Sequence, residues 1–175
     1  MSATEYIILV DEEDREIGFA EKLAAHEQNL LHRAFSVFIF RQHGEPELLL
    51  QQRALDKYHT GGLWTNTCCS HPRQGEETSA AAKRRLKEEF GITTTLRSLG
   101  KFHYNAHFSN GLAENEIDHV FVGHIDRETT ITPDANEIHA YRWTTLTDLD
   151  HELASHPEQF TPWFEQALRI ARQGI

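Results

Sequence analysis

Short runs of apolar and β-branched residues recur along the chain, and turn-forming residues separate them. Runs of this kind predict β-strands, which we place at residues 6–10, 34–40, 48–53, 64–69, 99–108, 117–125 and 138–143. Apolar residues at helical spacing predict helices, which we place at residues 77–90, 147–155 and 162–172. In the first helix, Ala82, Leu86 and Phe90 make a stripe at four-residue intervals. Strands with helices inserted between them predict an α/β/α sandwich around a mixed central sheet.

The composition is that of a packed globular protein, with 175 residues of which 39% are hydrophobic and 25% are charged. No linker or repeat divides the sequence, so we expect one domain over residues 1–175. Lys and Arg number 17 against 27 Asp and Glu, a net charge of −10 that repels nucleic acid and anionic membranes. An anionic ligand would therefore need a local basic cluster or a metal ion.

The longest apolar runs fall far short of the roughly 20 residues that a membrane span needs. The amino-terminal segment MSATEYIILVDEED also lacks the basic region of a signal peptide. Two cysteines in all cannot form a disulfide framework, which favours a reducing compartment. These features predict a cytoplasmic protein.

The two cysteines, Cys68 and Cys69, are adjacent in the extended segment WTNTCCSHP. Because side chains alternate along a strand, Cys69 and His71 are predicted to point to one face and Cys68 and Ser70 to the other. Free cysteine is often a small buried residue, and this interpretation suits Cys68. Cys69 shares a face with His71, so it is a candidate catalytic residue.

Histidines and glutamates occur at spacings that suit a metal site. On a strand, Glu114 and Glu116 would share one face and repel each other unless a cation lies between them; two solvated carboxylates beside a turn are the alternative. His26 and His32 are too far apart for one helix face and suit a loop around a centre. With His71 they offer three nitrogens and two oxygens, a set that suits a six-coordinate divalent ion. The Cys/His spacing of a closed zinc site is absent.

Residues 70–92, SHPRQGEETSAAAKRRLKEEFGI, resemble the Nudix box, which reads G-x₅-E-x₇-R-E-U-x-E-E-x-G-U with U aliphatic. The required offsets are occupied by Glu76, Arg84, Leu86, Glu88, Glu89, Gly91 and Ile92. Ser70 replaces the first glycine, and Arg85 replaces a glutamate. Nudix hydrolases gather carboxylates around magnesium on this helix face, so a cation there indicates diphosphate binding rather than hydrolysis. The alternative is a plain amphipathic helix with Arg84–Glu88 and Arg85–Glu89 pairs, each worth a few tenths of a kcal/mol.

Several more segments resemble type 1 isopentenyl-diphosphate delta-isomerases in the same order, namely HRAFSVFIF, LLLQQRALDKYHTGGLWTNTCCSHPRQGE, YNAHF, ENE and TPWF. The resemblance runs from about Glu21 to Trp163. It implies a Nudix-like fold and the interconversion of isopentenyl and dimethylallyl diphosphate in isoprenoid biosynthesis. The reaction would proceed by metal-dependent protonation and deprotonation through a tertiary carbocation. No flavin is expected, and no G-x-G-x-x-G fingerprint follows any predicted strand.

The resemblance also implies roles for individual residues. Cys69 and Glu116 would be the proton-transfer pair, with Tyr104 hydrogen-bonded to the acidic centre. A Mg²⁺ ion that bridges the substrate diphosphate would be held by Glu89 and the backbone carbonyl of Cys69. Trp163 would lie over the hydrocarbon tail. A second ion, Mn²⁺, Zn²⁺ or Mg²⁺, would be held by His26, His32, His71, Glu114 and Glu116. The diphosphate would be met by Lys22, Arg53, Lys57 and Arg85.

Two other classes of function compete with this one. A Nudix hydrolase that acts on a nucleoside diphosphate derivative would explain the Nudix box. It would not explain Arg85, Cys69 or the proposed metal ligands, which are His26, His32, His71, Glu114 and Glu116. A metal-binding or regulatory domain accounts for the ligand set but not for a proton-transfer pair beside a diphosphate site. The partner that we expect is a small-molecule diphosphate, with neither nucleic acid nor membrane, and the chain is expected to be a monomer or a weak homodimer.

Overall fold

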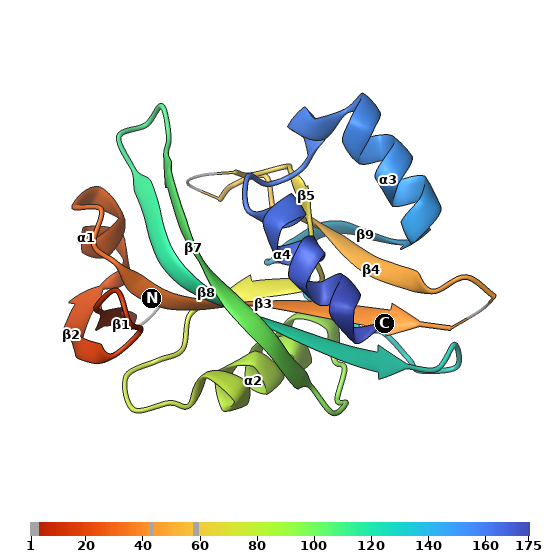
Figure 1. Cartoon of the computed structure of the whole chain (residues 1–175), viewed down its shortest axis with the longest axis horizontal. Helices are drawn as coiled ribbons and strands as arrows, with labels where there is room; N and C mark the ends of the chain where they lie inside the picture. Colours follow the sequence, from red (N-terminus) through yellow and green to blue (C-terminus); the bar gives the residue numbers. More distant parts are fainter. Residues whose placement is uncertain (1–3, 43, 58–59) are drawn as a thin grey trace.

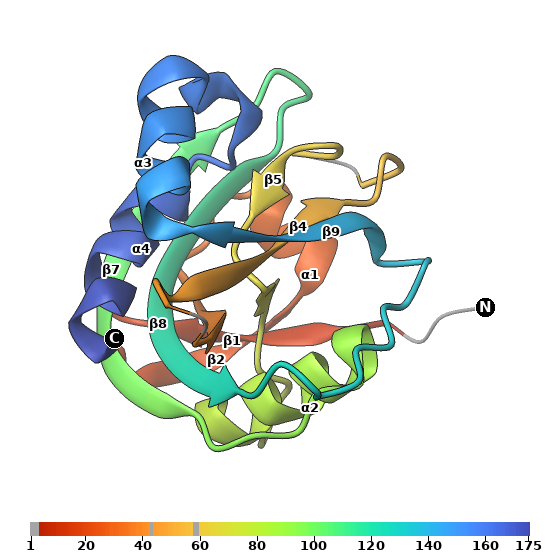
Figure 2. The same cartoon turned by 90° about the vertical axis from the view of Figure 1, so that its right-hand side faces the viewer.

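The computed structural model describes residues 4–42, 44–57 and 60–175. Within them, strands join into one mixed sheet with helices on its two faces (Figures 1 and 2). The strands are β1 (Tyr6–Val10), β2 (Glu16–Glu21), β3 (His32–Arg41), β4 (Glu47–Arg53), β5 (Trp64–Thr65), β6 (Cys68–Ser70), β7 (Arg97–His107), β8 (Ala113–Ile125) and β9 (Ile138–Thr145). The helices are α1 (Lys22–Glu27), α2 (Thr78–Phe90), α3 (Leu146–Ser155) and α4 (Phe164–Ala171), with 3₁₀ turns at Pro157–Gln159 and Arg172–Gly174.

Strand β3 is the centre of the sheet. It pairs in parallel with β8, from His32 opposite Glu116 to Arg41 opposite Ile125. It pairs antiparallel with β1, β4 and β6. This combination of parallel and antiparallel pairs confirms the predicted mixed sheet, and it sets the start of β3 beside the ENE segment of β8.

Successive side chains of β3 point to opposite faces of the sheet and contribute to a hydrophobic core on each face. Phe38 and Phe40 pack with residues of α3 and α4 on one face, whereas Val37 and Ile39 pack with residues of α2 on the other. Figure 1 shows α2 below the central strands, α3 above them and α4 crossing in front of them. Because β3 is buried on both faces, its sequence is a nearly continuous apolar run. Helices on both faces of the sheet confirm the predicted α/β/α sandwich.

Four features differ from the prediction. Strand β2 and helix α1 were not predicted, because β2 is a poorly buried edge strand and α1 has only 6 residues. The predicted strand 64–69 is split into β5 and β6 by Asn66 and Thr67. Helix α4 begins at Phe164, after the turn that contains Pro162. His26 lies in α1 and His32 begins β3, so a short helix-to-strand connection replaces the expected loop.

Helix α2 ends at Gly91, whose φ of 68° is left-handed and whose N–H donates to the Lys87 carbonyl. Glycine adopts this conformation readily, and it commonly ends helices in this way.

Among the residues that the structure describes, no helix has the length and hydropathy that crossing a bilayer requires.

Candidate functional site

A cavity lies between the first half of β3, strand β6 and helix α2. Of the residues selected from the sequence, it is lined by Lys22, Arg53, Lys57, Cys69, His71, Arg85, Glu89, Glu114, Glu116 and Trp163. The other three pack directly against this lining: His26 and His32 against His71, and Tyr104 against Trp163. The fold therefore gathers the whole predicted set in one place.

Three histidines form a cluster at one side of the cavity. One nitrogen from each of His26, His32 and His71 lies within 4.8 Å of the other two. His26 Nδ1 is 2.6 Å from the Lys22 carbonyl, and His32 Nδ1 is 2.9 Å from the Leu30 carbonyl. Because a carbonyl only accepts hydrogen bonds, Nδ1 carries a proton in both rings, which leaves Nε2 as the atom that could face a metal ion. Histidines that bind metals are usually oriented in this way.

Strand β8 adds carboxylates to the cluster. Glu114 and Glu116 are both buried and both line the cavity, so they share one face, as the alternation predicted. Glu116 Oε2 lies 3.0 Å from His71 Nε2 and 3.3 Å from His32 Nε2. Three imidazoles and two carboxylates within one buried cluster fit the coordination of a divalent ion, which makes this the candidate metal site.

The protonation states of the cluster suit metal ligation. Burial opposes the charge of Glu116, but hydrogen bonds with His32 and His71 outweigh it and hold the Glu116 pKa well below its usual range. Burial lowers the pKa of His71 to about 3. Burial also opposes protonation of His32, but the hydrogen bond to Glu116 prevails and raises its pKa. The ionised Glu116 and the neutral His71 are in the donor form that metal ions bind, and a metal ion at His32 would displace the proton that its raised pKa favours.

The two cysteines of β6 have different surroundings. Cys68 is fully buried in the core against α2, and its thiol donates to Glu89 Oε2 at 3.2 Å. Cys69 faces the cavity, and its thiol donates to Asn66 Oδ1 at 3.2 Å. Burial raises the pKa of Cys69 to about 12, so this side chain is a thiol. The predicted division between the cysteines is confirmed. Ser70 lies opposite Phe35 and Cys68 opposite Val37, two residues of the same core, so the register agrees with the predicted alternation, although Ser70 also borders the cavity.

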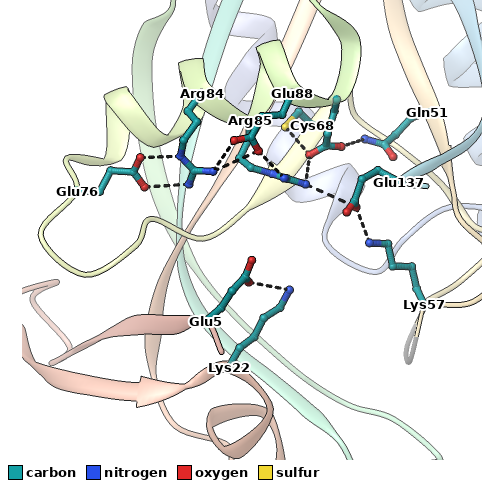
Figure 3. Close-up of polar contacts among 11 residues, drawn as sticks. Glu5, Lys22, Gln51, Lys57, Cys68, Glu76, Arg84, Arg85, Glu88 and Glu137 are labelled. Atoms are coloured by element: carbon teal, nitrogen blue, oxygen red, sulfur yellow. Dashed lines mark hydrogen bonds and ion pairs between the residues drawn. The ribbon is translucent and has the colours of Figure 1, made fainter. Parts of the chain in front are cut away.

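Basic side chains lie on the other side of the cavity, and three of them, Lys22, Lys57 and Arg85, are close to a carboxylate (Figure 3). Lys57 Nζ is 2.5 Å from Glu137 Oε2. Arg85 Nη2 is 3.0 Å from Glu89 Oε2 and 3.6 Å from Glu137 Oε2. These pairs hold the cations at the cavity although the protein as a whole is acidic.

The remaining two cations of the predicted set have separate partners. Lys22 Nζ lies 3.6 Å from Glu5 Oε2. The Arg53 guanidinium carbon lies 5.6 Å from the centre of the Trp163 ring, within the range of a cation–π contact. Cations from four separate parts of the chain thus line one cavity.

Helix α2 directs its two arginines differently. Arg84 pairs with Glu88 and also with Glu76, where two bonds measure 2.7 and 2.9 Å. Arg85 pairs with Glu88 and Glu89 and lines the cavity. Both of the pairs expected at four-residue spacing are present. The arginine that replaces a glutamate of the Nudix box is the one that faces the cavity.

Two aromatic residues close the cavity on the side of Cys69. Trp163 and Tyr104 are 3% and 6% exposed, and their rings meet edge to face with centroids 6.0 Å apart. The buried Tyr104 hydroxyl has no hydrogen-bond partner in the described part of the chain. Burial, with the charges of Glu114 and Glu116 nearby, raises the Tyr104 pKa. The hydroxyl is therefore protonated and available as a donor.

Several residues of the site were missed from the sequence. Asp118 lies on the cavity face of β8, and it could have been found by extending the alternation of the two glutamates by one step. Ser36 donates to Asp118 Oδ2 at 2.8 Å. Gln51 donates to Glu89 Oε1 at 3.1 Å. Gln51, Ser36 and Glu137 reach the cavity from separate strands and a loop, and no sequence spacing points to them.

Comparisons with known proteins agree with this geometry. The NUDIX domain model matches residues 30–164. An isopentenyl-diphosphate Delta-isomerase of Burkholderia multivorans is 50% identical over 171 residues, which are 98% of this chain and 94% of that protein. The enzyme of the same name from Serratia proteamaculans is 49% identical over 160 residues, 91% of this chain and 87% of that protein.

The fold is also similar to solved structures. The DR0079 protein of Deinococcus radiodurans superposes with a TM-score of 0.70 at 20% identity, over 96% of this chain and 98% of that one. The NUDIX domain of Shewanella oneidensis NrtR, solved with ADP ribose, has a TM-score of 0.63 at 16% identity, over 82% of this chain and 86% of that one. At these identities the likeness shows the fold alone.

Proposed function

This chain belongs to the type 1 isopentenyl-diphosphate Delta-isomerase family, and we propose that its cavity interconverts isopentenyl diphosphate and dimethylallyl diphosphate. One observation carries the proposal: a thiol, Cys69, and a carboxylate, Glu116, line the same cavity, whose far side is basic. Curated isomerases that are 46–50% identical over more than 80% of the chain support this activity.

Moving a double bond by one carbon requires an acid at one carbon, a base at another, and stabilisation of the cation between them. Cys69 and Glu116 supply two different proton-transfer groups. Because the reaction runs in both directions, each group donates a proton in one direction and accepts it in the other. Tyr104, whose ring packs against Trp163, keeps a protonated hydroxyl because burial and the nearby charges of Glu114 and Glu116 raise its pKa.

The hydrocarbon end of the substrate needs a dry pocket without nucleophiles that would trap a cation. Trp163 offers an aromatic face, and its single polar hydrogen is already donated to Asn66 at 3.2 Å. The π-face of a tryptophan attracts positive charge by about 2 kcal/mol or more when water is excluded. Trp163 therefore both excludes water and favours the charge that develops on the substrate.

The diphosphate end binds at Lys22, Arg53, Lys57 and Arg85. With a net charge of −10 on the whole chain, these local cations must overcome repulsion of the anion. Binding energy gained at this end holds the alkene in place at the other. Glu89, which is buried beside Arg85 and Gln51, and the carbonyl of Cys69 would hold a Mg²⁺ ion that accompanies the diphosphate.

The histidine cluster, with Glu114 and Glu116, would hold a second divalent ion, which we propose to be Mn²⁺, Zn²⁺ or Mg²⁺. Such an ion withdraws electron density from its ligands and so makes a coordinated carboxyl group a stronger acid. The chain's part is to fix the ligands. Carbonyls orient His26 and His32, and His71 and His32 hold the position of the Glu116 carboxylate.

Hydrolysis of a nucleoside diphosphate derivative is disfavoured by Arg85. Its guanidinium contacts Glu88 at 2.7 Å and Glu89 at 3.0 Å. A cation in this position repels the metal ions that the carboxylates of a Nudix helix would otherwise collect. No residue of the cavity favours this second function over isomerisation.

We propose that residues 1–175 form a single Nudix-type isomerase domain that acts as a monomer or a weak homodimer. Its substrate is a small diphosphate, and it uses neither flavin, nucleic acid nor membrane. Its cytoplasmic location stays a prediction.

Isomerisation in deuterated water tests the proposal. Purified protein is incubated with isopentenyl diphosphate and Mg²⁺, and the products are examined by mass spectrometry. We expect dimethylallyl diphosphate that carries deuterium, because each turnover adds a proton from an exchangeable group. Release of phosphate without the allylic isomer would instead indicate a hydrolase, and no reaction with retained metal would indicate a binding domain.

A further inference from the structure

Asn66 is a fully buried residue between β5 and β6, at the point where the predicted strand 64–69 is interrupted. Its side-chain oxygen accepts hydrogen bonds from Cys69 Sγ at 3.2 Å and from Trp163 Nε1 at 3.2 Å. Thr65 Oγ1 donates to the same oxygen at 2.9 Å. One amide oxygen thus joins the thiol and the indole that have separate tasks in the proposed reaction.

The orientation of this amide is fixed by its partners. Asn66 Nδ2 donates to the Val37 carbonyl at 3.1 Å and to the Cys68 carbonyl at 2.9 Å. Half a turn of the amide would set its NH₂ group against the indole N–H, which only donates, and its oxygen against two carbonyl oxygens, which only accept. The bonds to Trp163 and to both carbonyls would be lost at a buried site, where each unsatisfied polar group costs about 1–3 kcal/mol.

The thiol and the indole come from distant parts of the chain. Cys69 lies in β6, whereas Trp163 precedes α4. Hydrogen bonds to one shared acceptor fix two side chains from separate elements more closely than packing alone does. Asn66 is bonded to the sheet through Val37 and is therefore part of a rigid element.

We propose that Asn66 is a positioning residue that fixes the Cys69 thiol and the Trp163 ring relative to each other around the hydrocarbon end of the substrate. The inference rests on the proposed isomerase function. An acceptor oxygen directs the S–H bond of Cys69 along one line, and it holds the indole edge so that the ring keeps one tilt. Proton transfer depends strongly on this alignment, because a displacement of about 1 Å can slow a reaction about 100-fold.

The test compares Asn66→Ala with Thr67→Val. Thr67 is the adjacent buried residue, bonded to the Leu49 carbonyl at 2.7 Å and to the Ile39 amide at 2.9 Å, but not to Cys69 or Trp163. We expect Asn66→Ala to lower kcat by about 10–100-fold with KM within about twofold, since alignment and not substrate affinity is lost. Thr67→Val should lose stability while keeping kcat per folded molecule.

A second readout needs no activity. The Trp163 indole N–H proton is observed by NMR in the ligand-free protein and assigned by its absence in Trp163→Phe. We expect this signal to move upfield and exchange faster with water in Asn66→Ala, but not in Thr67→Val. If the wild-type protein fails to isomerise isopentenyl diphosphate, the proposed function fails, whereas the indole signal still tests Asn66.

Asn66→Asp provides a conservative substitution if Asn66→Ala does not fold. A buried carboxyl group is held neutral, so one of its oxygens can still accept from the thiol and the indole while its hydroxyl donates to a carbonyl. We expect kcat within about tenfold of wild type and a retained indole signal. An unchanged indole signal in Asn66→Ala, a lost one in Asn66→Asp, or equal losses of kcat in Asn66→Ala and Thr67→Val at equal folded fraction would overturn the proposal.

Discussion

His71 Nε2 and Glu116 Oε2 lie 3.0 Å apart, although 45 residues separate them in the chain. The same oxygen lies 3.3 Å from His32 Nε2, so one carboxylate oxygen serves two imidazoles. The parallel pairing that sets His32 opposite Glu116 brings them together. This arrangement predicts how the site responds when its ligands are removed.

We expect one tightly held divalent ion per chain, lost from the double variant His71→Ala, Glu114→Gln. Removal of one nitrogen and one anionic oxygen should weaken metal binding by about tenfold or more. Elemental analysis after dialysis measures the ion, and His151→Ala, an exposed position on α3, is the control that should retain it. Full occupancy in the double variant would contradict the assignment.

The two cysteines should respond oppositely to substitution. Cys69→Ala should abolish detectable isomerisation, because a positioned acid or base contributes about 10²–10⁴-fold to the rate. Cys68→Ala should retain most activity and lose about 1 kcal/mol of stability, since the Cys68 thiol lies in the core and donates to Glu89. Initial rates and urea unfolding measure both effects. Equal loss of activity at matched folded fraction would remove Cys69 from the reaction.

Strand periodicity explains why part of the site was predictable. Alternation places Glu114 and Glu116 on one face and separates Cys69 from Cys68, and these are local consequences of backbone geometry. Asp118 obeys the same period, and extending the alternation of the two glutamates by one step would have included it. The local sequence was therefore sufficient to predict which functional side chains share a face wherever those side chains belong to one strand.

Other parts of the site and fold depend on contacts between distant segments. Glu137 reaches Lys57 across 80 residues, and Asn66 reaches Trp163 across 97. Strand β2 and helix α1 are short and weakly buried, so their hydrophobic pattern is too brief to identify them. Their positions follow from tertiary packing, which outweighs local propensity.

Glu137 should compete with the substrate for its cations. Its carboxylate lies 2.5 Å from Lys57 Nζ and 3.6 Å from Arg85 Nη2 (Figure 3). Replacing it by glutamine removes a negative charge beside the diphosphate, so we expect Glu137→Gln to lower KM by about 2–5-fold with kcat nearly unchanged. Glu88→Gln, which also removes a carboxylate from Arg85 but does not line the cavity, is the matched control. A higher KM that depends on Mg²⁺ concentration would instead make Glu137 a metal ligand.

The Glu76–Arg84 pair should contribute a pH-dependent part of the stability. Hydrogen bonds from Arg84, above all, lower the Glu76 pKa below its ordinary value of 4.5. A carboxylate whose pKa is lowered by folding stabilises the protein above that ordinary value, and the contribution disappears as pH falls through the lowered pKa. We expect Glu76→Gln to lose about 1 kcal/mol near pH 7 and clearly less near pH 3. Urea unfolding at both pH values measures this, with the exposed Glu12→Gln as control; a constant difference would contradict it.

Trp163→Phe separates stabilisation of positive charge from simple packing. Phenylalanine keeps an aromatic ring against Tyr104 and near Arg53 but has a weaker π-face and no N–H for Asn66. If the ring stabilises the substrate cation, kcat should fall more than KM rises, because the interaction strengthens only as charge develops. We expect a loss of about 1–2 kcal/mol, or about 5–30-fold in rate.

The Trp163→Phe variant also tests the alternative that Trp163 only packs against the substrate. If Trp163 only packs on the hydrocarbon tail, the smaller ring weakens ground and transition states alike, which raises KM and leaves kcat nearly intact. Phe164→Leu, a substitution in the core beside Trp163 that does not line the cavity, controls for a general loosening of α4. Steady-state kinetics on the three proteins decide between the two roles. A raised KM with an unchanged kcat in Trp163→Phe would assign stabilisation of the cation to Tyr104, the carboxylates or the diphosphate itself.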